Sequence, residues 1–295
     1  MTLRKLMEEG TALLLEAGIA DPACDAGILL LWAYDLDRTQ YLVKADEESD
    51  DPLTESVYKR AIMTRSKHTP VQYITGRAPF YGMEFAVSPD VLIPRFDTEI
   101  LVEEAVRRLK SLLKEKERKL SVLDMCTGSG CIAISVAAAL DCEMTAVDLS
   151  QKALDMAALN ERVLLDPERN GALKHTPSPI RFLQSNMFEA VSGEYDCILS
   201  NPPYIRPEVI ETLDIEVKDR EPRLALDGGP DGLDFYRILA REAGPHLRKG
   251  GLLLMEIGCD QAQAVTQLLT EYAYAGIEVV KDLAGLDRVI AARRN

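Results

Sequence analysis

The chain passes from a predicted strand into a predicted helix at Asp124-Met125-Cys126-Thr127-Gly128-Ser129-Gly130-Cys131-Ile132-Ala133. Gly128, Gly130 and Ala133 fit the Gly-x-Gly-x-x-Gly/Ala pattern, in which small residues let the backbone approach a ligand and let the helix pack on the strand. The mostly apolar residues 120–125 before the turn are typical of a buried strand. The order of strand, glycine turn and helix predicts the start of a Rossmann-like domain.

Strands and helices alternate from Leu120 to the end of the chain. We expect helices near residues 131–140, 150–163, 232–247 and 260–272, and strands near 120–125, 143–148, 180–184, 195–200, 251–257, 277–280 and 287–292. This alternation predicts an α/β fold with a doubly wound, mostly parallel sheet of seven strands.

The first part of the chain has a different pattern. From Leu3 to about Lys67 apolar residues recur at helical spacing, and Asp21-Pro22 and Asp51-Pro52 are typical helix starts. Aromatic and β-branched runs on either side of Gly82 predict a β-hairpin between about 70 and 90. We therefore expect a small helical bundle at residues 1–68, a hairpin linker at 69–92 and the α/β domain at 93–295.

Composition and charge narrow the class of protein. The 295 residues carry a formal net charge of -14, which argues against a nucleic-acid backbone as the main partner. The six cysteines form no Cys-x-x-Cys pair and the three histidines are far apart, so we expect no disulfide and no metal. The chain contains no apolar run of about 20 residues and no signal-peptide pattern, which predicts a cytoplasmic protein without a membrane anchor.

A carboxylate follows the second predicted strand. Asp148 lies twenty positions after Gly128, where it can accept hydrogen bonds from both hydroxyls of a ribose. Nicotinamide dinucleotides and S-adenosylmethionine both fit this geometry. If Asp124, just before the glycine turn, faces the ligand, it would repel a pyrophosphate but could bind the ammonium group of S-adenosylmethionine directly or through water. This favours S-adenosylmethionine.

A second motif, Asn201-Pro202-Pro203-Tyr204, directly follows the apolar run 195–199. The Asn201 side chain and the Pro202 backbone each offer a carbonyl acceptor, so the pair can hold the two hydrogens of one amino group, and the Tyr204 ring can stack on a flat amide or base. A turn that only ends a strand would explain the same residues. A clamp for –NH2 has a use in methylation and none in hydride transfer, but it does not distinguish adenine from glutamine.

At these residues the chain resembles the N5-glutamine methyltransferases of peptide chain release factors. The resemblance also includes Pro70-Val71-Gln72-Tyr73-Ile74-Thr75-Gly76, Val91-Leu92-Ile93-Pro94-Arg95, Ser200 to Ile205, and Glu221-Pro222-Arg223-Leu224-Ala225-Leu226. It implies a helical substrate-recognition domain, a hairpin linker and a Rossmann-like methyltransferase domain. The implied reaction, part of translation termination, moves a methyl group from S-adenosylmethionine to the side-chain amide nitrogen (N5) of the Gln in a Gly-Gly-Gln loop of class I release factors.

The resemblance also implies the site residues. It places the cofactor loop on Cys126, Thr127, Gly128, Ser129 and Gly130, the ribose acid on Asp148, the adenine side on Asn186 and Met187, and the substrate clamp on Asn201, Pro202, Pro203 and Tyr204, with Asn201 also beside the cofactor. The chain departs from the family at Cys126, Phe96 and Met187, where glycine, proline and an aromatic residue are common. These departures bear on cofactor affinity and leave the reaction class unchanged.

Several alternatives stay open. A nucleic-acid adenine-N6 methyltransferase would share the clamp but would need a basic groove and a base-flipping pocket. A non-catalytic adaptor would use the helical bundle to bind partners. Arg95, Thr98 and Glu99 either order the entrance of the site or only start a helix. We expect a monomer that acts on class I release factors and binds neither nucleic acid directly nor membranes.

Overall fold

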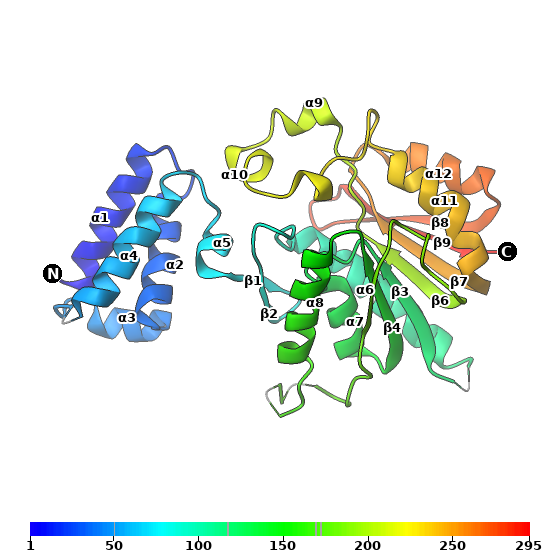
Figure 1. The fold of residues 1–295 in the computed structure, drawn as a ribbon, viewed down its shortest axis with the longest axis horizontal. Helices are drawn as coiled ribbons and strands as arrows, with labels where there is room; N and C mark the ends of the chain where they lie inside the picture. The colour runs from blue at the N-terminus through cyan, green and yellow to red at the C-terminus, as the bar shows by residue number, and fades with distance from the viewer. Residues whose placement is uncertain (50, 117, 169, 172) are drawn as a thin grey trace. The chain divides into compact units, whose positions relative to one another are not determined.

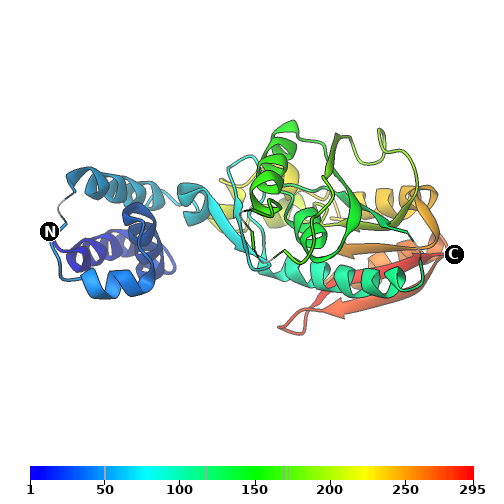
Figure 2. The same ribbon diagram turned by 90° about the horizontal axis from the view of Figure 1, so that it is seen from below.

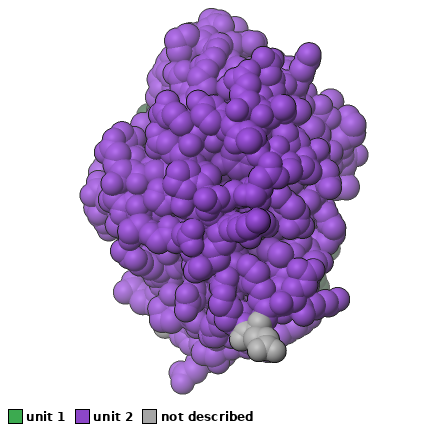
Figure 3. Space-filling model, turned by 90° about the vertical axis from the view of Figure 1, so that its right-hand side faces the viewer, with its two compact units in different colours: residues 1–77, 214–220 green, residues 78–213, 221–295 purple. Residues whose placement is uncertain are grey.

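The chain divides into two compact units in a computed structural model, which describes residues 1–49, 51–116, 118–168, 170–171 and 173–295. Unit 1 comprises residues 1–77 and 214–220, and unit 2 comprises residues 78–213 and 221–295. Figure 3 shows one face of unit 2, in purple. Each unit has a hydrophobic core of its own. The division expected after residue 68 therefore falls after residue 77, and one segment of unit 1 comes from later in the sequence.

Unit 1 is a helical bundle, drawn mainly in blue in Figure 1. Its helices are α1 (Leu3–Glu16), α2 (Pro22–Tyr34), α3 (Arg38–Lys44) and α4 (Pro52–Arg65), packed around a core that includes Leu6, Leu29 and Tyr58. The predicted starts at Pro22 and Pro52 are confirmed, and the Asp51 carboxylate accepts hydrogen bonds from the first backbone N–H groups of α4.

Ion pairs and hydrogen bonds at the end of α4 explain why residues 214–220, which come later in the sequence, belong to unit 1. The buried Arg65 guanidinium lies 2.7 Å from Asp25 and 2.5 Å from Glu216, which belongs to the short helix α10 (Ile215–Lys218). Arg220 donates a hydrogen bond to the backbone carbonyl of Lys67. These contacts hold residues 214–220 against the bundle.

The prediction of a β-hairpin between about 70 and 90 is wrong for residues 71–75. Strands β1 (Arg77–Phe80) and β2 (Met83–Ala86) form the hairpin, but residues 71–75 form a helix, α5 (Val71–Thr75). Pro70 precedes this helix and Gly76, at φ 73°, ends it, while Val71 is buried in the core of unit 1. Burial and the two flanking residues therefore outweigh the strand propensity of Val, Tyr, Ile and Thr.

Within the described residues, the sheet of unit 2 has seven strands in the order β5-β4-β3-β6-β7-β9-β8. Figures 1 and 2 show this sheet in two views. The strands are β3 (Leu120–Met125), β4 (Cys142–Asp148), β5 (Arg181–Gln184), β6 (Tyr195–Ser200), β7 (Leu247–Glu256), β8 (Tyr274–Lys281) and β9 (Asp287–Arg294). The first five of that spatial order are parallel, and β9 pairs antiparallel with both β7 and β8. The predicted mostly parallel seven-stranded sheet is confirmed.

Both faces of this sheet are covered. Successive residues of β3 point to opposite faces, so that Val122 and Leu123 belong to different hydrophobic cores. The core of Val122 includes residues of helices α6 (Glu99–Leu113) and α7 (Cys131–Ala139). The core of Leu123 includes residues of α11 (Asp234–His246) and α12 (Ala262–Glu271). Helix α8 (Gln151–Leu164) lies beside α7, and short helices α9 (Pro207–Ile210), η1 (Phe96–Thr98) and η2 (Arg223–Ala225) occur in the connections. Within the described ranges, no helix has both the length and the apolar composition needed to cross a membrane.

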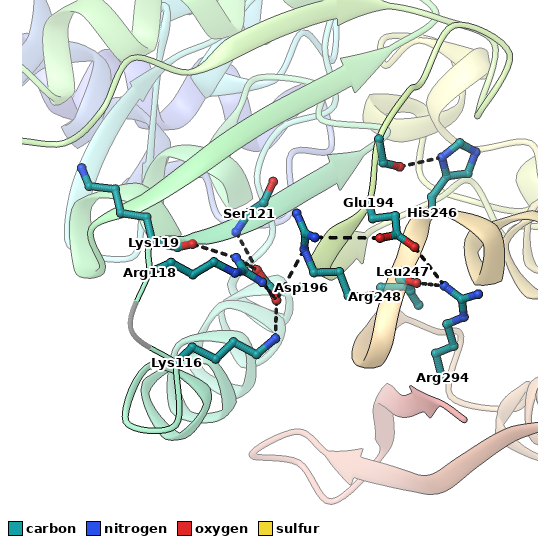
Figure 4. Close-up of polar contacts among 11 residues, drawn as sticks. Lys116, Arg118, Lys119, Ser121, Glu194, Asp196, His246, Leu247, Arg248 and Arg294 are labelled. Atoms are coloured by element: carbon teal, nitrogen blue, oxygen red, sulfur yellow. Dashed lines mark hydrogen bonds and ion pairs between the residues drawn. The ribbon is translucent and has the colours of Figure 1, made fainter.

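An ion cluster holds the amino end of β6 (Figure 4). The fully buried Asp196 carboxylate accepts hydrogen bonds from Lys116 Nζ (2.5 Å), Arg118 Nη2 (2.7 Å) and the backbone N–H of Ser121 (3.0 Å). Burial alone would raise the pKa of Asp196, but these donors outweigh it and hold that pKa at about 2. The carboxylate therefore stays ionised at neutral pH and ties β3 and the connection before it to β6, at the end of the sheet opposite the predicted site.

Candidate active site

Neighbouring parallel strands of unit 2 end level with one another. Met125 of β3 pairs with Ser200 of β6, and the Ser200 hydroxyl also donates to the Met125 carbonyl at 2.9 Å. The strand order reverses between β3 and β6, which is where open α/β sheets bind ligands. The residues that directly follow this level on β3, β4, β6 and β7 are Cys126, Asp148, Asn201 and Glu256, respectively.

A cavity opens at this edge. It brings together most of the predicted site residues, namely Cys126, Gly128, Asp148, Asn186, Met187, Asn201 and Pro203. Thr127, Ser129, Gly130, Pro202 and Tyr204 lie outside its lining. The lining also includes residues that were not predicted for the site, among them the connection 89–92, Pro222, Leu224, Ala225 and Phe235.

The glycine turn has a left-handed backbone at three positions. Cys126, Gly128 and Gly130 have φ values of 63°, 56° and 80°. A Cβ on Gly130 would lie 3.0 Å from the side chains of Ile134 and Ala157, so glycine is required for α7 to pack against α8. A Cβ on Gly128 would meet no atom within 4 Å, because its backbone faces open space in the cavity wall.

Cys126 is strained, because a left-handed φ costs a side-chain-bearing residue about 1 to 2 kcal/mol. We expect Cys126→Gly to remove this strain, against a smaller entropic cost from the more flexible unfolded chain. The melting temperature should rise by about 2 °C, and the Kd for S-adenosylmethionine should change by less than about threefold. Differential scanning fluorimetry and calorimetric titration measure these quantities. Cys126→Ala is the control, because it removes the sulfur but keeps the strain; an equal rise in that variant would contradict the strain argument.

Asp148 is held by the backbone on both of its oxygens. Oδ2 accepts from the Gly128 N–H and Oδ1 from the Ser150 N–H, both at 2.9 Å. Burial raises the pKa of Asp148, and the N–H groups of Ser150, Gly128 and Leu149 oppose that rise. A carboxylate has about four acceptor positions, so Asp148 can still accept from two hydroxyl groups in the cavity.

Asp124 lies beneath the turn and outside the cavity lining. Its Oδ2 accepts from the Thr127 hydroxyl at 2.6 Å and from the Ala133 N–H at 3.2 Å, so it caps the start of α7. Oδ1 is buried and has no hydrogen-bond partner among the residues that the structure describes. Burial raises the pKa of Asp124 to about 7, while the Thr127 and Ala133 hydrogen bonds lower it. A cation in the cavity would stabilise the ionised form, whereas a pyrophosphate would be repelled by it.

Asn186 and Met187 form the wall beyond β5. Met187 has a φ of 47°, and its carbonyl accepts from the Ser185 hydroxyl at 2.8 Å. Its sulfur lies 3.9 Å from Cys126 Sγ, so two of the residues that depart from the family pattern touch each other. The Asn186 amide donates to Glu189 at 2.7 Å. Phe96, the third departure, is 70% exposed and lies outside the cavity lining.

The clamp is anchored from behind by a hydrogen-bond chain. Asn201 Nδ2 donates to Thr98 Oγ1 (3.2 Å), and the Thr98 hydroxyl donates to Glu256 Oε2 (2.6 Å). The Tyr204 hydroxyl donates to Glu256 Oε1 (3.2 Å). Tyr204 is therefore held by its hydroxyl on a buried carboxylate, and its predicted stacking role stays a prediction.

Two glycines fit tightly against the backbone of the clamp. A Cβ on Gly228 would lie 2.6 Å from the Tyr204 Cα, and a Cβ on Gly232 would lie 2.5 Å from the Tyr204 carbonyl oxygen. Gln261 Nε2 also donates to that carbonyl at 3.0 Å. Only glycine can occupy positions 228 and 232 without moving residues 203–204.

Sequence reasoning missed Glu256 and treated Thr98 as no more than a candidate for the site entrance. Glu256 is only 2% exposed and ends the apolar run 252–255 of β7. An ionisable residue at the carboxyl end of a buried strand is a detectable signal, because a buried charge is costly without partners. Arg95 instead pairs with Glu221 at 2.5 Å, and Glu99 accepts from the Tyr81 N–H.

The chain matches two family models. Residues 5–76 match the model described as the PrmC N-terminal domain, and residues 101–216 match the Methyltransferase small domain. The two matches correspond to most of unit 1 and to the first part of the α/β domain.

Curated relatives match over their full length. The chain is 36% identical to the release factor glutamine methyltransferase of Geobacter sulfurreducens, over 99% of this chain and 96% of that protein. It is 39% identical to the protein of the same name from Moorella thermoacetica, over 100% and 99%. A solved protein-(glutamine-N5) methyltransferase (release factor-specific) from Alicyclobacillus acidocaldarius is 35% identical and aligns over 72% of this chain and 99% of its own, with a TM-score of 0.41.

Proposed function

The chain belongs to the family of release factor glutamine methyltransferases, and from this premise we propose that it methylates the Gln of the Gly-Gly-Gln loop in class I peptide chain release factors. The acceptor is the side-chain amide nitrogen (N5), and the methyl donor is S-adenosylmethionine. The observation that carries the proposal is that Asn201, from the amino-group clamp, and Asp148, the ribose acid, line one cavity.

The residues around the cavity fit S-adenosylmethionine. Asp148 retains acceptor positions for the two ribose hydroxyls, and the apolar side chains of Leu149 and Met187 suit an adenine ring. The carboxylate of Asp148, which lines the cavity, favours a cationic ligand over a pyrophosphate. When bound, S-adenosylmethionine supplies a methyl group activated by its positively charged sulfur.

The clamp makes the acceptor nitrogen reactive. An amide nitrogen is a poor nucleophile because its lone pair is delocalised into the carbonyl. We infer that the Asn201 side-chain oxygen and the Pro202 carbonyl accept both N–H hydrogens, which stabilises the positive charge that develops on nitrogen. Holding the nitrogen in line with the methyl group supplies a further part of the acceleration. Asn201 and Pro202 thus act through orientation and electrostatics, and no strong base is required before transfer.

Unit 1 and the acidic charge support a protein substrate. We infer that the helical part, residues 1–68, recognises the release factor. A net charge of -14 steers basic partners toward the protein and repels a nucleic-acid backbone. Because its substrates act on ribosomes, the protein is expected in the cytoplasm. We propose that it acts as a monomer, because one chain supplies both the cavity and the clamp and the site needs no residue from a second copy.

In the test, the protein is incubated with labelled S-adenosylmethionine and one of three acceptors. The acceptors are a release factor, the same factor with the glutamine of its Gly-Gly-Gln loop substituted, and DNA. We expect label on the unmodified release factor alone. Label on DNA would identify an adenine methyltransferase instead. Equal label on both release factors would disprove the glutamine assignment, and a failure to bind S-adenosylmethionine would favour a non-catalytic adaptor.

A further inference from the structure

A hydroxyl group connects the clamp to a buried acid behind it. Thr98 Oγ1 lies 3.2 Å from Asn201 Nδ2 and 2.6 Å from Glu256 Oε2. Thr98 and Glu256 are each only 2% exposed, and they come from different elements, η1 and β7. Water therefore does not compete for these hydrogen bonds.

The chemistry of this chain fixes its direction. The Thr98 hydroxyl donates its single hydrogen to Glu256 Oε2, so that hydrogen points away from Asn201. Only lone pairs of Thr98 Oγ1 then face Asn201, and the Asn201 side chain must present its NH2 group to them. The opposite rotamer of the Asn201 amide would place two acceptor oxygens about 3.2 Å apart. The Asn201 carbonyl oxygen is therefore directed away from Thr98.

Glu256 can serve two donors because both of its oxygens are acceptors. Its Oε1 accepts from the Tyr204 hydroxyl while its Oε2 accepts from Thr98. Burial raises the pKa of Glu256, and the charge of Asp97 adds to that rise. The Thr98 and Tyr204 hydroxyls and the positive charge of Arg288 oppose this rise without cancelling it.

We propose that Thr98 and Glu256 are positioning residues that lock the Asn201 amide with its carbonyl oxygen toward the acceptor substrate, and that this lock makes the site select a primary amide over a carboxylate. The inference rests on the proposed function. A Gln side chain brings two N–H hydrogens to the acceptors of Asn201 and Pro202, whereas a Glu side chain brings lone pairs that they repel. An unlocked Asn201 can rotate and donate to a carboxylate, so the discrimination weakens.

The main test compares Thr98→Val, which keeps the shape but loses the hydroxyl, with Thr98→Ser, which keeps the hydroxyl. Peptides carrying Gly-Gly-Gln or Gly-Gly-Glu serve as probes, and their Kd values give the discrimination ratio. In Thr98→Val we expect this ratio and kcat each to fall about tenfold, with the Kd for S-adenosylmethionine within about threefold of wild type. Thr98→Ser should retain most of both quantities.

Thr145→Val is the matched control, because Thr145 is a buried threonine of β4 outside the cavity lining. It should leave kcat and the discrimination ratio at wild-type values. A Thr98→Val protein that distinguishes Gln from Glu as well as wild type does would overturn the proposal. So would equal losses in Thr98→Val and Thr98→Ser, since these would indicate a packing effect alone.

Glu256→Gln tests the other member of the pair. A carboxamide accepts at only one end, so either Thr98 or Tyr204 loses its acceptor, and kcat should fall about tenfold at an unchanged Kd for S-adenosylmethionine. Wild-type turnover in this variant would remove Glu256 from the proposal.

A substrate-free measurement separates this inference from the proposed function. The Asn201 side-chain NH2 signal, assigned by its loss in Asn201→Asp, should show slow hydrogen exchange in wild type and Thr98→Ser, and faster exchange in Thr98→Val. Equal exchange in all three proteins would overturn the lock whatever the substrate is. Failure of the wild type to methylate a release factor, with the exchange pattern intact, would instead reject the proposed substrate.

Discussion

Asn201→Ala is expected to lower kcat by about 100- to 1,000-fold, the range found when one preorganised hydrogen-bonding group is removed from a site of developing charge. The side chain supplies one of the two proposed acceptors for the substrate amide, and its NH2 group is already engaged with Thr98. Alanine leaves the nitrogen free to stay planar and unreactive. Single-turnover kinetics at saturating S-adenosylmethionine with a release factor would measure this loss.

The cofactor affinity of the same variant provides the internal control. Asn201 is only one of many residues along the cavity, so the Kd for S-adenosylmethionine should change by less than about fivefold. Asn201→Gln keeps the carboxamide but moves it by one methylene group, and it should not restore turnover. Turnover by Asn201→Ala close to that of wild type would disprove the clamp assignment.

The sheet and its functional edge could be predicted from local patterns. Strands such as 120–125 and 195–200 are mostly apolar segments, and parallel pairing then brings the residues after them to one edge. Cys126, Asp148 and Asn201 therefore lie together as the order of motifs predicts. Here each local signal agrees with the global fold.

Other features depend on contacts between distant residues. The Thr98–Glu256 hydrogen bond joins residues 158 positions apart, and no local pattern pairs them. Residues 71–75 have strand propensity, but burial of Val71 and the stop at Gly76 make them helical. The positive φ of Cys126 could be suspected only because the related family often has glycine there.

Asp148→Ala should affect the other half of the site. The carboxylate is proposed to bind both ribose hydroxyls, and it also accepts from the Gly128 and Ser150 N–H groups that shape the cavity wall. Charge-assisted hydrogen bonds contribute about 1.5 to 3 kcal/mol each. Loss of the carboxylate should therefore raise the Kd for S-adenosylmethionine by about 100-fold or more, while kcat at saturating cofactor falls by less than about tenfold. Calorimetric titration and turnover at high cofactor concentration separate these two effects.

Two further variants show whether the effect belongs to this carboxylate. Asp148→Asn keeps the shape and one acceptor oxygen, so its Kd should lie between those of wild type and Asp148→Ala. Asp141→Ala removes an equal charge just before the opposite end of β4, where Asp141 pairs with Lys119, and it should leave the Kd unchanged. If Asp141→Ala weakened binding as much as Asp148→Ala does, the loss would reflect overall charge. If Asp148→Ala bound the cofactor like wild type, the ribose would have to be held elsewhere. We therefore expect Asn201→Ala to lower mainly kcat, because Asn201 acts on the acceptor nitrogen. Asp148→Ala should raise mainly the Kd for S-adenosylmethionine, because Asp148 acts on the cofactor.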